Sequence, residues 1–190
     1  MKLGVHECTM AAWIVQAAYW TLSMVRTKTT VRHQSVPSRL LHLILIVPAF
    51  WLLFERASNF GVLDMRFIPL HSGIAWAGFA VTIAGLVFAL WARMTIGTNW
   101  SGTVTLKQDH ELIRSGPYRL VRHPIYTGLL FAAMGTAVAF GVLRGLLGAF
   151  LMFIAFFQKS RVEEQFMVEQ FNGEYLAYRN SVKAIIPFIL

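Results

Sequence analysis

The chain of 190 residues contains a single cysteine, Cys8. One thiol cannot form an internal disulfide, and it cannot build a zinc site made of several cysteines. Other metal sites have no support in the spacing, because the sequence has neither H-E-x-x-H nor two histidines four residues apart. We therefore expect no bound metal.

Charged residues are also scarce. They make up 14% of the chain, whereas 56% of the residues are hydrophobic. Soluble domains usually carry about 25% charged residues. This composition predicts an integral membrane protein. Several spans of about 20 residues each would use most of the length, which favours one domain over residues 1–190.

Acidic residues are fewer than basic ones, 9 against 17, and the net charge is +8. In a soluble protein this excess would suggest nucleic-acid binding. Here the basic residues lie mainly between apolar runs, where Lys and Arg hold loops on the cytoplasmic side of a membrane. No basic face of a soluble module is visible, so we predict no nucleic-acid partner.

Common motifs of nucleophilic and nucleotide chemistry are missing as well. There is no G-x-S-x-G, and Ser101 and Ser115 have no neighbouring base in the sequence. No glycine-rich loop of the kind that cradles phosphate is present either. A hydrolase therefore has no support in the sequence.

Five apolar runs, at 8–25, 40–54, 74–92, 124–142 and 146–157, predict membrane spans. The last run is too short to cross alone as a standard helix. We expect it to form a close hairpin with the fourth, through a tight turn at Leu143-Arg144-Gly145, and to continue past the membrane. The expected fold is an all-α membrane bundle of about five transmembrane helices, with C-terminal helices on the cytosolic side.

The basic clusters predict the orientation of these spans. The linker 26–39 carries four basic residues and no acidic one, and Arg93 closes the third span. The positive-inside rule places both in the cytoplasm. The N-terminus is then outside and the C-terminus is cytoplasmic.

The stretch 116–128 is rich in Arg, His, Tyr and Pro, although it leads directly into an apolar run. Two further polar groups, His110-Glu111 and Glu163-Glu164, fall on the same predicted side. Together they predict a small polar or cationic ligand held between aromatic rings and carboxylates. Each group also has a structural interpretation: the tyrosines as interfacial anchors, His123 as a cap of the span, and the glutamates as a solvated helix face.

The order of these groups resembles the isoprenylcysteine carboxyl methyltransferase and phospholipid methyltransferase superfamily. The resemblance rests on Tyr118-x-x-x-Arg122-His123-Pro124-x-Tyr126-x-Gly128, then Glu163-Glu164, then Phe171-x-Gly-Glu-Tyr-x-x-Tyr178, and covers roughly 99–187. It implies a membrane methyltransferase that takes S-adenosylmethionine from the cytosol and a lipophilic acceptor from the bilayer. The implied reaction is most like isoprenylcysteine carboxyl O-methylation, with cofactor segments at 99–126 and 158–188.

Carried over by position, the cofactor contacts of the family fall on His110, Glu111, Leu112, Ile113, Tyr118, His123, Pro124, Ile125, Tyr126 and Glu164. A carboxylate such as Glu164 suits the ammonium group of the cofactor. His123 and the N–H groups of a helix opened by Pro124 suit its carboxylate. Tyr118 and Tyr126 can flank the adenine or approach the sulfonium.

The acceptor side departs from the family. The prenylcysteine enzymes have an arginine one turn before the cofactor glutamate, and the resemblance assigns it to the acceptor carboxylate. This chain has Ser160 there, between Lys159 and Arg161, and each neighbour points about 100° away on a helix. Lys159 and Arg161 are both candidate replacements, and the sequence does not choose between them. The candidate catalytic residues are Arg161, His123 and Glu163, the last two as bases if the acceptor is an amine.

Other functions are compatible with the same segments. A sterol-type membrane reductase would use NADPH and would need basic groups such as Arg114 and Arg119 for the 2′-phosphate. Methylation of a lipid amine or a small thiol would use the same cofactor site. A small transporter would place charged residues inside its spans, which are almost free of them here.

Overall fold

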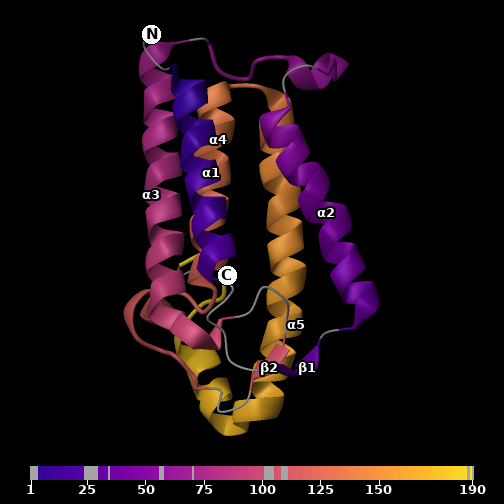
Figure 1. Cartoon of the computed structure of the whole chain (residues 1–190), viewed down its shortest axis with the longest axis vertical. Coiled ribbons are helices and arrows are strands. Elements are labelled where there is room, and N and C mark those ends of the chain that lie inside the picture. The colour runs from indigo at the N-terminus through magenta and orange to yellow at the C-terminus, as the bar shows by residue number, and fades with distance from the viewer. Residues whose placement is uncertain are drawn as a thin grey trace.

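The computed structural model is a bundle of five helices whose polar segments gather at one end (Figure 1). It describes residues 4–23, 30–33, 35–55, 58–69, 71–100, 105–107, 111–187 and 189. The helices are α1 (Val5–Ser23), α2 (Val36–Phe54), α3 (Ser72–Ile96), α4 (Pro124–Phe140) and α5 (Leu143–Ser181). The predicted all-α fold class is confirmed.

The helices suit a membrane. By length and composition, α2, α3 and α5 can each cross one, and α4 is a shorter apolar helix. Large apolar side chains are exposed along the outer faces, among them Ile44, Val47, Val87 and Phe150. Such a surface is unfavourable in water, whereas lipid chains are as apolar as these side chains. The exposed faces are therefore the ones that meet the bilayer.

Two predicted boundaries shift. Helix α2 starts at Val36, because Pro37 can occupy a first turn that needs no N–H donor. Its 19 residues reach about 28 Å, which is enough for a crossing. The turn predicted at Leu143-Arg144-Gly145 is wrong: Gly141 adopts the left-handed conformation, with φ of 69°, and ends α4. Leu143 already begins α5.

Helices α3 and α4 touch backbone to backbone. A Cβ added to Gly85 would lie 2.5 Å from the carbonyl oxygen of Gly128, and one added to Gly78 would lie 2.7 Å from that of Gly135. Only glycine permits such an approach. These contacts hold α4 closely against the middle of α3.

Several short elements complete the polar end. Strands β1 (Thr30–His33) and β2 (Thr105–Lys107) pair antiparallel and join the segment before α2 to the segment after α3. The 3₁₀ helices η2 (Gly97–Asn99) and η3 (Gly116–Arg119) lie in the long polar loop, and η1 (Gly61–Asp64) lies at the opposite end of the bundle.

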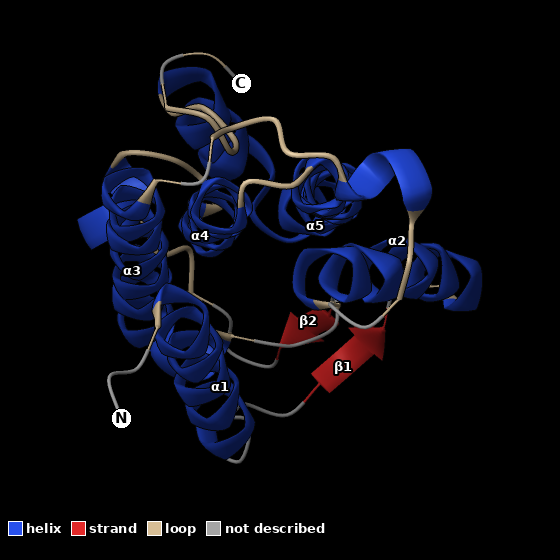
Figure 2. Cartoon of the chain, turned by 90° about the horizontal axis from the view of Figure 1, so that it is seen from above, coloured by secondary structure: helices blue, strands red, loops and turns tan. Residues whose placement is uncertain are grey.

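Helix α5 continues beyond its apolar part, as predicted, until Asn172 breaks it with φ of 43° and ψ of −119°. The chain then turns back beneath the bundle (Figure 1). Seen from above, α4 lies between α3 and α5, while α1 and α2 lie at separate edges (Figure 2). The start of α4 is therefore enclosed by neighbouring elements.

Candidate functional site

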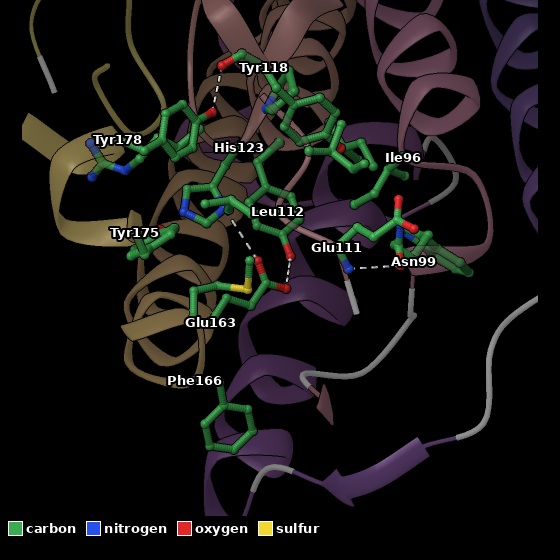
Figure 3. Close-up of a pocket in the computed structure, with 17 residues that line it drawn as sticks. Ile96, Asn99, Glu111, Leu112, Tyr118, His123, Glu163, Phe166, Tyr175 and Tyr178 are labelled. Atoms are coloured by element: carbon green, nitrogen blue, oxygen red, sulfur yellow. Dashed lines mark hydrogen bonds and ion pairs between the residues drawn. The ribbon is translucent and has the colours of Figure 1, made fainter. Parts of the chain in front are cut away.

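A cavity at the polar end lies between the end of α3, the loop 111–123, the start of α4 and the second half of α5 (Figure 3). It brings together nearly all of the predicted site residues: Glu111, Leu112, Ile113, Tyr118, His123, Pro124, Ile125, Tyr126 and Glu163. Most of its wall is apolar or aromatic, and carboxylates are placed at two sides.

Local sequence explains why the loop enters the cavity as it does. Gly116 has φ of 57°, a conformation that favours glycine, and it begins η3, with Pro117 in the same first turn. This turn buries Tyr118, whose carbonyl oxygen accepts a 2.5 Å hydrogen bond from the hydroxyl of Tyr178. Pro124 sets the first turn of α4, so the preceding His123 is held where the helix begins.

His123 lies between the two adjacent glutamates of α5. Its Nδ1 is 3.3 Å from Oε2 of Glu163, and its Nε2 is 3.3 Å from Oε1 of Glu164. Burial lowers the pKa of His123, but the hydrogen bonds to both carboxylates outweigh burial and leave the pKa raised above 6.5. The imidazole therefore favours the charged form and neutralises part of the glutamate pair.

Glu164 is an anchor rather than part of the cavity wall. It is 5% exposed, and its Oε1 accepts hydrogen bonds from Nε and Nη2 of Arg122 at 2.9 and 2.6 Å. Nε of Arg179 is 3.6 Å from its Oε2. Burial raises the pKa of Glu164, but the bonds from His123 and Arg122 dominate and lower the pKa to about 2. The carboxylate is thus ionised and fully engaged.

Arg122 connects this anchor to the C-terminal segment. Its guanidinium also donates to the carbonyl oxygens of Arg179, at 3.1 Å, and of Val182. The backbone N–H groups of Arg122 and His123 donate to Lys183 and Ala184 at 2.8 and 2.9 Å. The C-terminal segment is therefore held by backbone hydrogen bonds as well as by the buried side chain of Ile185.

Glu163 faces the cavity and is held by Tyr126. The Tyr126 hydroxyl donates a 2.5 Å hydrogen bond to Oε1 of Glu163. The Tyr126 ring stacks between His123 and Phe156, with centroid distances of 5.6 and 4.7 Å and interplanar angles of 9°. This stack fixes the direction in which the Glu163 carboxylate points.

The three residues considered for the acceptor side, Lys159, Ser160 and Arg161, lie in different environments. Arg161 is exposed, and its guanidinium lies 4.9 Å from the ring centroid of Phe157, away from the cavity wall. Lys159 instead places its ammonium 5.6 Å from the ring centroid of Tyr126. Ser160 is buried and donates to the carbonyl oxygen of Phe157 at 2.8 Å. The structure therefore does not bring Arg161 to the site, and His110 lies outside the described residues.

Several wall residues were not predicted. Phe166 and Met167 line the cavity with Glu163, and their spacing of three and four residues on one helix face was a usable signal. Trp100 also lines the cavity, and the guanidinium of Arg93 lies 4.4 Å from its ring centroid. No pattern in the sequence pointed to this pairing, because it depends on how α3 ends.

No group of three His, Cys, Asp or Glu side chains among the described residues is arranged to hold a metal ion.

Comparison with known proteins links this site to a family. Residues 74–174, more than half of the chain, match the family model described as phospholipid methyltransferase. The chain is 35% identical over 115 residues to a protein-S-isoprenylcysteine O-methyltransferase of Saccharomyces cerevisiae, which covers 59% of this chain and 48% of that one. It is 34% identical over 133 residues to the one from Xenopus laevis, covering 67% and 46%.

A solved structure, that of the eukaryotic intramembrane Ras methyltransferase (isoprenylcysteine carboxyl methyltransferase), matches with a TM-score of 0.60 and 26% identity. The match covers 82% of this chain and 54% of the other. The chain thus spans about half the length of these relatives. The family match runs from α3, through the loop and α4, into the second half of α5, and so includes every side of the cavity. The chain belongs to the phospholipid methyltransferase family.

Proposed function

We propose that this protein is an integral membrane methyltransferase that transfers a methyl group from S-adenosylmethionine to a lipophilic acceptor. The acceptor class we favour is a prenylated cysteine carboxylate. The similarity to isoprenylcysteine methyltransferases supports this class. The observation that carries the proposal is the cavity, which joins aromatic rings to the Glu163 carboxylate at the end of a membrane bundle.

The donor set of the cavity fits this cofactor. Glu163 offers a carboxylate to the ammonium group, and the aromatic rings of the cavity wall, Tyr118 among them, can attract the sulfonium. The first-turn N–H groups of Ile125 and Tyr126 have no acceptor within α4, and both residues line the cavity, so we assign the cofactor carboxylate to these groups. Tyr118, Tyr175 and Phe166 add apolar wall for the nucleoside.

S-adenosylmethionine supplies an electrophilic methyl group on its sulfonium. Transfer of that group to an anion removes charge and needs little proton transfer, so the protein contributes orientation and exclusion of water. In this chain the C-terminal segment closes the start of α4 through Lys183 and Ala184. A carboxylate acceptor needs no base. An amine acceptor would use Glu163 or His123, which share a hydrogen bond.

The favoured acceptor carries a carboxylate, which a cation on the α5 side of the cavity could receive. Lys159, whose ammonium is beside the Tyr126 ring, suits this role better than the exposed Arg161. We therefore place the acceptor carboxylate on the Lys159 side of Tyr126.

We also propose that the cavity faces the cytoplasm, with the N-terminus outside. Support comes from the basic side chains at the cavity end, such as Arg93, Arg114 and Arg122, against fewer at the end that holds η1. A reporter fused to the C-terminus should read as cytoplasmic, and an external reading would overturn this orientation.

The test of the function is a methyl-transfer assay with the purified protein, tritiated S-adenosylmethionine, and either prenylcysteine analogues or membrane lipid extract. The expected product on prenylcysteine is a base-labile methyl ester. A protein that binds NADPH but not S-adenosylmethionine in parallel titrations would be a reductase instead. Transfer to lipid extract alone would keep the cofactor assignment and replace the acceptor.

A further inference from the structure

A second cavity lies between α1, α2 and α4, apart from the one described above. Its wall includes Trp13 and Trp20 of α1, Phe50 of α2 and Leu129 of α4. Ile14, at its rim, is 62% exposed. In a membrane this side of the cavity meets lipid chains, so an apolar molecule can reach it without crossing water.

One side chain that lines the second cavity is polar, whereas its neighbours in the wall are mostly apolar. Gln16 is 8% exposed, and its amide nitrogen Nε2 is buried without a hydrogen-bond partner. The neighbouring polar group is satisfied, because Nε1 of Trp13 donates to Oγ1 of Thr136 at 3.0 Å. A buried donor without an acceptor is unusual, and it is most costly in an apolar environment. A carbonyl oxygen on a bound molecule would satisfy it.

The second cavity leads toward the first. Trp20 is one helical turn after Gln16, about 6 Å along the axis of α1, and its ring is 6.3 Å from that of Trp100, which lines the first cavity. On α4, Leu129 is likewise one turn after Ile125, which lines the first cavity. A molecule whose chain fills the second cavity would therefore have its head beside the first.

We propose that the second cavity binds the apolar chain of the methyl acceptor, and that Gln16 donates a hydrogen bond to a carbonyl oxygen where that chain joins the head. The occupant is a single-chain lipid with an amide or peptide carbonyl, as a prenylated cysteine within a peptide has. The inference rests on the proposed function, because it names the part of the acceptor that each cavity takes. Gln16 is a specificity-determining residue, since it contacts the acceptor away from the reacting atoms.

The proposed hydrogen bond from Gln16 to the amide carbonyl is tested with two acceptors that differ in one group. N-acetyl-S-farnesylcysteine has the amide, and S-farnesyl-3-mercaptopropionate lacks it while keeping the thioether and the carboxylate. Their dissociation constants are measured by displacement of tritiated N-acetyl-S-farnesylcysteine from the full chain in detergent. The amide acceptor should bind about tenfold tighter to the wild type. Gln16→Leu should reduce this preference to near unity without lowering the Tm.

Binding of the apolar chain in the second cavity is tested with a matched pair of substitutions on α1. Ala17 lines the second cavity, whereas the adjacent Ala18 does not, and both are exposed. Ala17→Trp should weaken binding of either farnesyl compound by at least about tenfold. Ala18→Trp should leave binding unchanged. Equal effects of the two variants would overturn the chain site.

A preference for the amide acceptor that persists in Gln16→Leu would overturn the role of Gln16. Calorimetry with S-adenosylmethionine tests the proposed function independently of the farnesyl-binding experiments. If the wild type fails to bind the cofactor, the methyltransferase assignment falls, whereas the farnesyl displacement results still decide whether the cavity is a lipid site.

Discussion

Glu163 and Glu164 are neighbours in the sequence, but they lie against opposite nitrogens of the His123 ring, each at 3.3 Å. Because consecutive residues on a helix point about 100° apart, one carboxylate faces the cavity and the other faces Arg122. The two glutamates therefore have different tasks. Glu163 lines the cavity, and Glu164 holds the surrounding elements together.

Glu163→Gln should weaken binding of S-adenosylmethionine. The amide keeps the shape of the side chain but loses the charge that faces the cavity, so we expect the dissociation constant to rise about tenfold to a hundredfold. Isothermal titration calorimetry measures the change. Glu169→Gln, at an exposed position on the same helix, is the control. Unchanged affinity in Glu163→Gln would remove Glu163 from the cofactor site.

Glu164→Ala should mainly destabilise the protein. It leaves the buried guanidinium of Arg122 without its carboxylate, which costs about 3–5 kcal/mol. Thermal unfolding in detergent measures the loss. Glu174→Ala breaks a similar pair with Arg114, but both side chains are about half exposed, so its effect should stay below about 1 kcal/mol. Equal losses in the two variants would contradict the anchor role.

The pH dependence of stability follows from the same cluster. Because the pKa of His123 is raised, its contribution is complete below about 6.5 and is lost as pH rises through the folded pKa. Because the pKa of Glu164 is lowered, its contribution is complete above about 4.5 and is lost as pH falls toward about 2. The cluster therefore stabilises most between these limits, at about pH 4.5–6.5.

This profile is measured as Tm against pH for the wild type and for His123→Gln. The variant should lose the fall in Tm on the alkaline side, because glutamine does not titrate. An unchanged alkaline fall would assign it to another group.

Gly85→Ala should push α3 and α4 apart, because its Cβ would lie 2.5 Å from backbone atoms of Gly128 and Ala132. Overpacking of this kind costs about 1–3 kcal/mol, and Tm should fall accordingly. Gly173→Ala is the matched control, since its Cβ would meet nothing within 4 Å. Helix propensity predicts that the control is up to about 1 kcal/mol more stable. A Gly85→Ala protein as stable as the wild type would refute the tight contact.

The sequence alone predicts the helices, because each apolar run long enough to meet the bilayer forms hydrogen bonds within its own backbone. It also determined most of the cavity, since Tyr118, His123, Pro124 and Tyr126 are close in the chain and the helix start at Pro124 fixes their relative positions. The class of the fold followed from the same local information.

Tertiary contacts set which glutamate faces the cavity, that Arg122 fastens the C-terminal segment, and that Arg161 points away. These contacts also set the pairing of β1 with β2 and the burial of Gln16 Nε2 without a hydrogen-bond partner. These outcomes depend on the rotation of α5 about its axis and on contacts between residues about 40 to 75 positions apart. A local pattern gives the faces of a helix, whereas its neighbours in space decide which face becomes the site.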